Sequence, residues 1–404
     1  MSADGRDMGG WRAAFQSSPA DYQPLPQEAR QRITELFKLA PDALDVMDPK
    51  PPVTGTLRYR FAVSATGTKV RVRLSNEEGH VPLLVLSASI GLAADGIAAK
   101  PGSLTRLTFG GRSTTSIPAG APALSDPVAL VTTPGTELLV SVYTKDAVQL
   151  KPNGGAIIEV AAGDQTLRYT LDASASAIGR PLVSEVEVLA ANAPHVIVAL
   201  GDSTTDGTRQ HLGELRGWPE ELEHRLASRK TGDPYAVVNA GISGNRVLSP
   251  GWGASALSRL DRDVLRLEGV SHLIVLEGTN DIGLSGQSIF GDNPIVTPGD
   301  LIAGYRQIIA RAHARGIEVL LGTIMPFGAS PMYFSPEHER LREDVNLWIR
   351  TSKEADAVID FDKVARDPAS PNAMRKDFGS SDGLHPGEAG YKAMGDAFDL
   401  ALFP

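Results

Sequence analysis

The sequence predicts an α/β fold with a doubly wound, five-stranded parallel sheet, preceded by an antiparallel β-sandwich. Three observations predict this arrangement. Apolar residues recur with a period of two from about Gly55 to Leu171, strands alternate with helices after about Glu187, and 404 residues exceed the size at which one hydrophobic core stops growing. We therefore expect an N-terminal arm at 1–52, a sandwich domain at 53–187 and an α/β domain at 188–404.

Composition and periodicity predict the structure of the N-terminal arm and of the sandwich domain. The arm is rich in proline and contains one expected helix, Pro26–Leu39. In the sandwich, Val70, Val72 and Leu74 alternate with charged residues, as in a strand with one buried face. Clusters rich in Gly and Pro separate further apolar runs. Strands are expected at Val81–Ala88, Arg106–Phe109, Pro127–Val131, Glu137–Tyr143, Ala156–Val160 and Thr166–Leu171.

The α/β part contains continuous apolar runs, which are typical of parallel strands buried on both faces. One expected helix presents Leu301, Tyr305 and Ile308 on one face, and another begins with Ser335 as its N-cap. In such a sheet, ligands bind outside the carboxyl ends of the strands. The expected strands are His195–Leu200, Ala236–Asn239, His272–Glu277, Glu318–Met325 and Val358–Phe361.

A nucleophile and a base are found at the two ends of this part. Ser203 lies in Gly201-Asp202-Ser203, directly after the first strand. A serine hydroxyl needs a neighbouring base to accept its proton. His385 is the expected base, because Asp382, three residues earlier, can reach the far nitrogen of its imidazole. The structural alternatives are that Ser203 caps the following helix and that Asp382 starts a turn.

Two more loops follow parallel strands, and both contain Gly and Asn. They are Asn239–Asn245, after the second strand, and Gly278–Asp281, after the third. Acyl transfer needs hydrogen-bond donors for the developing oxyanion, and glycine allows a backbone N–H to come close while Asn adds a side-chain donor. Each loop alone is also ordinary turn chemistry. Their position at consecutive strand ends favours a shared site.

These four blocks, in this order, resemble the SGNH (GDSL-type) hydrolases, a family of esterases and lipases. The resemblance covers about half of the chain, from roughly residue 196 to 403. It implies a catalytic triad of Ser203, Asp382 and His385. The upstream half is similar to the sandwich domain that some bacterial members carry.

The resemblance also implies an oxyanion hole. Its donors would be the backbone N–H groups of Ser203 and Gly244 and the side chain of Asn280. The choice of Gly244 over Gly241 rests on the resemblance alone. The implied activity is that of a serine esterase that forms an acyl-enzyme and requires neither a metal nor another cofactor.

The substrate is predicted only as a class, a small-molecule or carbohydrate ester. We expect short acyl chains, including O-acetyl groups on carbohydrates, because the loops after the catalytic strands show no continuous amphipathic lid. Candidate pocket residues are Trp252, the 332–334 segment and the 281–299 loop with Leu284, Ile289 and Phe290, although each is equally typical of a packed loop.

Two other functions use the same residues differently. A metal-dependent phosphoesterase would bind metal through Asp202, Asp206, Asp281 and His385, but the sequence has no His-x-His or Asp-x-His pair to support a two-metal site. A catalytically inactive carbohydrate-binding protein is the second alternative. Such proteins usually lose the nucleophile or the base, and both candidates are present here.

Composition restricts partners and compartment. A net charge of -9 without a basic cluster argues against nucleic acid, and the longest apolar runs are too short to span a bilayer. The chain has no cysteine, so disulfides and thiolate metal sites are excluded. Residues 1–10 lack the apolar core of a signal peptide. We expect a cytoplasmic protein, or a secreted or periplasmic one if a leader was removed, and we predict no oligomeric state.

Overall fold

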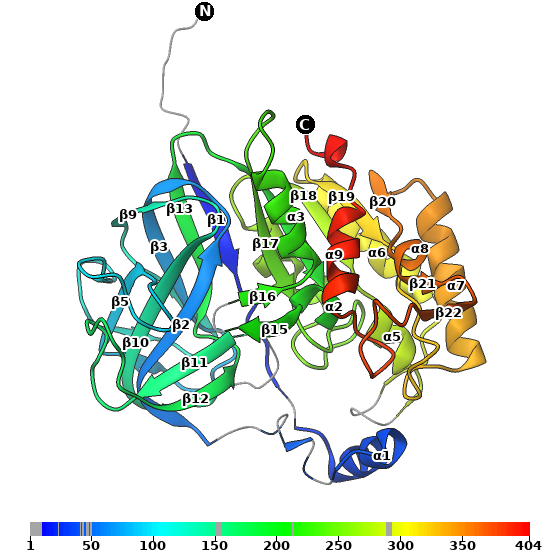
Figure 1. Ribbon diagram of the computed structural model, residues 1–404, viewed down its shortest axis with the longest axis horizontal. Helices are drawn as coiled ribbons and strands as arrows, with labels where there is room; N and C mark the ends of the chain where they lie inside the picture. The colour runs from blue at the N-terminus through cyan, green and yellow to red at the C-terminus, as the bar shows by residue number, and fades with distance from the viewer. Residues whose placement is uncertain are drawn as a thin grey trace, which may run out of the picture.

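The structure is a computed structural model that describes residues 10–22, 24–40, 42, 44–45, 48, 51–150, 156–211, 214–287 and 293–404. Figure 1 shows two parts side by side, a set of strands in blue to green and a sheet flanked by helices in green to red. Within the described ranges, no helix combines the length and the apolar character needed to cross a membrane.

The α/β part contains the expected five-stranded sheet, and all of its neighbouring strands are parallel. The first strand in the chain lies second from the edge, so the order of connection reverses beside it. Such a reversal opens a crevice at the carboxyl ends of the strands. In spatial order the strands are β17 (Tyr235–Gly241), β14 (His195–Gly201), β18 (Val270–Leu276), β19 (Glu318–Gly322) and β20 (Ala357–Ile359).

Helices cover both faces of this sheet, which explains the continuous apolar runs. Val196 and Val198 of β14 pack into one core, and Ile197 and Ala199 pack into the other. The first core includes side chains of α4 (Ala256–Leu260), η2 (Asp261–Leu265), α6 (Pro298–His313) and α7 (Pro336–Thr351). The second includes side chains of α3 (Trp218–Ala227), α8 (Phe361–Ala365) and α9 (Glu388–Asp396). As predicted, Ser335 caps α7 by accepting the backbone N–H of His338.

The upstream part consists of two antiparallel sheets around one core, as expected for a sandwich. One sheet has the order β12 (Ala173–Gly179), β11 (Ala156–Ala161), β2 (Val53–Val63), β10 (Thr136–Val148), β5 (Ser87–Leu92) and β6 (Thr105–Arg106). The other has the order β1 (Gly10–Gln16), β13 (Val183–Ala190), β3 (Gly67–Asn76) and β8 (Ala121–Leu124), with β9 (Val128–Thr132) also paired to β3.

Short elements complete the fold. Three small antiparallel pairs are β4 (Leu83–Val85) with β7 (Thr115–Ile117), β15 (Thr208–His211) with β16 (Glu214–Arg216), and β21 (Arg366–Asp367) with β22 (Ser370–Met374). The helices not yet mentioned are α1 (Gln27–Phe37), α2 (Ser203–Asp206), α5 (Thr279–Gly283) and η3 (Leu400–Leu402).

Two predicted strands differ from the structure. Arg106–Phe109 is a strand only at Arg106, the end of β6. Thr166–Leu171 forms turns, and the strand in this region is β12 instead. The buried guanidinium of Arg58 donates to the backbone carbonyls of Arg168 and Tyr169, at 2.7 and 3.3 Å. The Arg168 carbonyl therefore accepts from a side chain, and the Tyr169 carbonyl accepts from this side chain and from the Ala99 backbone N–H at 2.8 Å.

The N-terminal segment contacts both parts of the molecule. Besides the expected helix, it contains β1, which pairs with β13 in the sandwich, and β13 itself runs on to Ala190. Gln16, at the end of β1, donates to the backbone oxygen of Asp263 in the α/β part. Ala29 and Ile33 of α1 pack with Leu25 and Leu44 in a cluster that Trp252 and Met332 also contact.

Candidate active site

The structure brings Ser203, His385 and Asp382 into one hydrogen-bonded line. Ser203 Oγ lies 2.7 Å from His385 Nε2, and His385 Nδ1 lies 2.5 Å from Asp382 Oδ2. Ser203 is the first residue of α2, directly after β14, whereas the other two residues lie in the loop before α9. If Nδ1 donates to the carboxylate, Nε2 is left as the acceptor for the serine hydroxyl.

The turn that presents Ser203 depends on its two preceding residues. Asp202 is the N-cap of α2, and its Oδ1 accepts the Thr204 backbone N–H at 2.8 Å. Burial raises the pKa of Asp202 above its usual value, against the effect of these hydrogen bonds. A Cβ on Gly201 would lie 2.3 Å from the Leu276 carbonyl oxygen, so only glycine fits between β14 and β18 here. The structural alternative for Ser203 was that it caps the following helix. Ser203 does begin α2, but the N-cap is Asp202.

The carboxylate of Asp382 also organises its own loop. Its Oδ1 accepts the Ser380 hydroxyl and the backbone N–H groups of Leu384 and His385, at 2.6, 2.9 and 3.0 Å. Burial opposes ionisation, but the hydrogen bond and charge of His385 outweigh it and hold the pKa of Asp382 well below its usual range. Gly383 has a φ of 69°, and a Cβ there would clash with the backbone of Ala329. Asp382 thus makes the turn and holds the imidazole at the same time.

Asn280, on α5, has its amide held from both ends. The Tyr333 hydroxyl donates to Asn280 Oδ1 at 2.6 Å, and Asn280 Nδ2 donates to the Asn245 carbonyl at 2.9 Å. These two bonds assign the oxygen and nitrogen ends of the amide. An amide nitrogen carries two hydrogens, so Nδ2 retains a second one for another acceptor.

The two candidate glycines differ in what their backbone N–H groups do. Gly241 N–H donates to Asn239 Oδ1 at 2.9 Å and is therefore occupied. No described residue accepts a hydrogen bond from Gly244 N–H. Gly244 has a φ of 78°, and a Cβ there would lie 2.4 Å from the ring of Trp252. The geometry favours Gly244 as the free donor and explains why this position needs glycine.

Three supporting residues were not predicted from the sequence. Arg259 is fully buried and donates to Asn245 Oδ1 and to the carbonyls of Gly201 and Ala240, at 2.9, 3.1 and 2.6 Å. It therefore ties the ends of β14 and β17 to the Asn245 loop. Asn245 was noted only as part of a loop, and Tyr333 only as a candidate pocket residue. No local pattern marks any of these contacts, because each joins distant segments of the chain.

Two of the three carboxylates considered as metal ligands, those of Asp206 and Asp281, are bonded to other partners. Asp206 Oδ2 pairs with Arg180 at 2.7 Å, and Asp281 accepts the backbone N–H groups of Val247 and Leu248. Burial raises the pKa of Asp281 to about 6. Across the described ranges, no three His, Asp or Glu side chains are grouped so that they could hold a metal ion.

The candidate pocket residues have different positions. Leu284 is buried and Phe334 is exposed. The Trp252 ring packs at a tilt against Tyr22 from the N-terminal segment, with ring centroids 5.6 Å apart. Tyr333 fills the space beside Gly283. Ile289 and Phe290 lie outside the described residues.

Comparison with known proteins shows one family. Residues 199–393 match the GDSL-like Lipase/Acylhydrolase family, in agreement with the four blocks of the sequence. No curated protein matches the chain.

Several solved structures are similar to part of the chain. An α/β hydrolase enzyme from the metagenome of Lake Arreo is 21% identical with a TM-score of 0.40, covering 52% of this chain and 94% of its own. An acetyl xylan esterase from Geobacillus stearothermophilus is 20% identical with a TM-score of 0.39, covering 51% and 93%. A GDSL-like lipase from Bacteroides thetaiotaomicron is 18% identical with a TM-score of 0.35, covering 50% and 84%.

Proposed function

Because residues 199–393 are a domain of the GDSL-like lipase and acylhydrolase family, we propose that the protein is a serine esterase with Ser203 as nucleophile and His385 as general base. The observation that carries this proposal is the line from Ser203 through His385 to Asp382, with 2.7 Å and 2.5 Å between the bonded atoms. A base within this distance of a hydroxyl can remove its proton during attack.

The proposed reaction has two half-reactions. Ser203 Oγ attacks the ester carbonyl while its proton passes to His385 Nε2, and the imidazolium then gives that proton to the departing alcohol. The product of this half is an acyl-enzyme. Water attacks it with His385 again acting as base, which releases the carboxylic acid and restores the serine hydroxyl. Asp382, ionised because its pKa is low, stabilises the imidazolium in both halves.

Three donors are proposed for the oxyanion. They are the backbone N–H groups of Ser203 and Gly244 and the second hydrogen on Nδ2 of Asn280. The Gly244 N–H has no acceptor among the described residues, and the Asn280 amide is held by Tyr333 and Asn245. Donors held in advance stabilise charge without reorganising during the reaction.

For the substrate, we propose esters of short acyl groups, including O-acetyl groups on carbohydrates. Tyr333 lies against Asn280 and Gly283, and the Trp252 ring lies against Gly244, so large rings already occupy space beside the proposed donors. A chain-length series of nitrophenyl esters, from acetate to palmitate, tests this proposal through kcat/KM. We expect the maximum at acetyl to butyryl. A maximum at ten carbons or longer would contradict the short-acyl proposal while leaving the esterase proposal intact.

The decisive experiment is the turnover of a chromogenic acetate ester by the Ser203→Ala variant. It should keep less than about a hundredth of the wild-type kcat while its circular dichroism is unchanged. Ser228→Ala, an exposed serine after α3, is the matched control and should keep full activity. Trapping an acyl group on Ser203 by mass spectrometry would add direct support. Hydrolysis that survives in Ser203→Ala and disappears with a chelator would instead favour the metal-dependent phosphoesterase, and an inert wild-type protein would favour the carbohydrate-binding alternative.

A further inference from the structure

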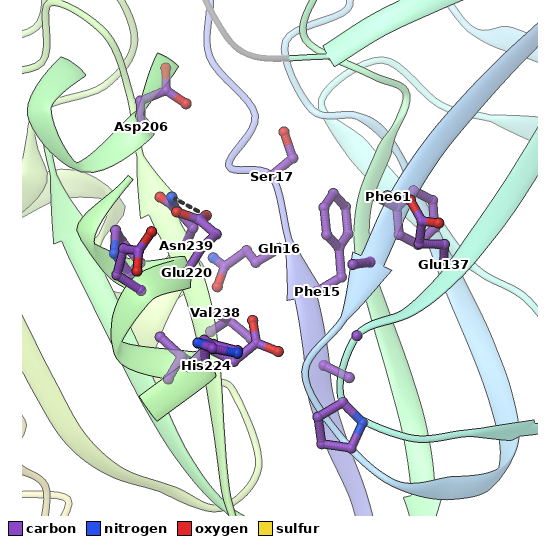
Figure 2. Close-up of a pocket in the computed structure, with 18 of the residues that line it drawn as sticks. Phe15, Gln16, Ser17, Phe61, Glu137, Asp206, Glu220, His224, Val238 and Asn239 are labelled. Carbon is purple, nitrogen blue, oxygen red and sulfur yellow. Dashed lines mark hydrogen bonds between the residues drawn. The ribbon is translucent and has the colours of Figure 1, made fainter. Parts of the chain in front are cut away.

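A cavity of about 780 Å³ lies between the sandwich and the α/β part. Figure 2 shows Phe15 and Phe61 on its sandwich side and Glu220, His224 and Asn239 on its α/β side. The rings of Phe15 and Phe61 stack with their centroids 4.3 Å apart. The residues that line this cavity do not include the candidate catalytic residues, so it is a second site. Its volume is in the range of pockets that bind small organic molecules.

Two buried oxygen atoms in this cavity have no hydrogen-bond donor. Gln16 is only 3% exposed, and its Nε2 donates to the Asp263 carbonyl while its Oε1 has no partner. Figure 2 shows this side chain extending from β1 toward the side that carries Glu220. Glu220 Oε1 accepts from Asn239 Nδ2 at 3.1 Å, whereas its Oε2 has no partner. A buried acceptor without a donor costs about 1–3 kcal/mol, so these oxygens are suited to a bound molecule that supplies N–H or O–H groups.

The charges of the wall favour a cation. Every lysine and arginine that lines the cavity already forms an ion pair or donates to backbone carbonyls. Arg60 pairs with Glu137, Arg180 with Asp206 and Lys392 with Asp396, while Arg225 donates to the Gly395 and Phe398 carbonyls.

Glu220 and Glu223, on α3, form no ion pair with any residue that the structure describes. Burial raises the pKa of Glu220 and of Glu223 to about 7. Among the described residues, none forms a hydrogen bond or ion pair with Glu223. The two groups would therefore each gain from a positive charge placed in the cavity.

We propose that this cavity binds an organic ammonium ion, a primary amine that carries an apolar body. The ammonium group would donate to Glu220, Glu223 and Gln16, and the apolar body would lie against Phe15 and Phe61. An aromatic face also attracts a nearby cation. A neutral polyol would supply donors as well, but it would leave two partly buried carboxylates without a counter-charge. This is why the wall favours an amine over a sugar.

Calorimetric titration of the full chain with phenethylammonium chloride tests the proposal. The titration is run at about pH 8, where groups with a pKa near 7 are mostly ionised. We expect saturable binding of the amine and none of 2-phenylethanol, which has the same apolar body without the charge. Glu223→Gln should weaken amine binding by about tenfold or more, because it removes the negative charge that strengthens the hydrogen bond to the ammonium group. Glu343→Gln, an exposed glutamate on α7, is the matched control and should bind as the wild type does.

Thermal unfolding of each variant shows whether it is folded at the titration temperature, and Gln16→Leu provides a second variant that alters the cavity without changing charge. Weaker amine binding by folded Gln16→Leu would support the proposal. The proposal is overturned if the wild type does not bind the amine saturably, if 2-phenylethanol binds equally well, or if Glu223→Gln leaves the affinity unchanged. Binding of a neutral oligosaccharide in place of the amine would assign the cavity to a carbohydrate instead.

Discussion

The hydroxyl of Tyr333 donates a hydrogen bond to Asn280 Oδ1 over 2.6 Å, across 53 residues of sequence. Tyr333 is almost completely buried, and its ring packs at an angle to Phe327 with centroids 6.2 Å apart. The tyrosine is therefore firmly placed, and it determines which end of the Asn280 amide is the hydrogen-bond donor. In the proposed mechanism, Tyr333 is a positioning residue that acts through Asn280.

Tyr333→Phe should lower kcat by about tenfold while KM changes little, because the amide loses the bond that fixes its donor. Steady-state kinetics on a chromogenic acetate ester measure both constants. Tyr305→Phe is a matched control, since Tyr305 is also buried and donates over 2.6 Å to a backbone carbonyl, that of Glu277. A similar loss of kcat in both variants would show that Tyr333 contributes through packing and not through its hydrogen bond to Asn280.

Replacing Asn280 itself should have a larger effect. Asn280→Ala removes the proposed oxyanion donor, and loss of one such donor typically lowers kcat by about 10²–10³. Binding of the ground-state ester should change far less, so KM is the internal reference. A variant with nearly normal kcat would show that backbone groups alone form the oxyanion hole.

Asp382→Asn separates the two tasks of this carboxylate. The asparagine oxygen can still accept from Leu384 and His385, which preserves the turn, but its NH₂ group cannot accept from His385 Nδ1. We expect kcat to fall by about 10³–10⁴, because the imidazole is then favoured in the wrong tautomer. Ser380→Ala removes only the hydroxyl that donates to Oδ1, and it should cost much less. If the two variants are equally slow, the loss of activity comes from a disturbed 380–385 loop and not from the wrong tautomer of His385.

Glu223 should make folding stability depend on pH. Its pKa in the folded protein is about 7, raised by burial, so the folded state keeps this proton after the unfolded chain has lost it. Stability should therefore fall as pH rises from about 4 to about 7. Glu223→Gln should remove on the order of 1–2 kcal/mol of this fall, allowing for partial exposure. The measurement is the thermal midpoint of both proteins at about pH 5 and about pH 8. An equal shift in both proteins would show that Glu223 does not contribute.

Much of the fold could be predicted because local patterns and tertiary packing agree. The residues of β14 alternate between two apolar cores, so the strand reads as a continuous apolar run. Ser335 caps its helix in the predicted way. Ser203 could be selected because it follows a parallel strand, whose carboxyl end lies at the ligand-binding edge of the sheet. Asp382 and His385 could be selected because their spacing of three residues allows the carboxylate to reach the imidazole.

The remainder depends on contacts that no local pattern encodes. Strand β12 consists mainly of Ala and Ser, so it lacks the large apolar residues by which a strand is recognised. The segment at 166–171 has strand-like residues, but the carbonyls of Arg168 and Tyr169 accept from Arg58, 110 and 111 residues away. Arg259 and Tyr333 were missed for the same reason. A buried polar side chain finds its partners only when distant loops have come together.

The N-terminal segment, which contacts both parts of the molecule, should hold these parts together if the chain is cleaved between them. Strand β1 is hydrogen-bonded within the sandwich, Arg12 donates to the Pro194 carbonyl at the entry to β14, and Tyr22 packs on Trp252 in the α/β part. The covalent connection between the halves, residues 191–194, is therefore not the only link between them. A single proteolytic cut there would leave two fragments that remain associated. The N-terminal segment pairs as a strand with the sandwich and contacts the α/β part through its side chains.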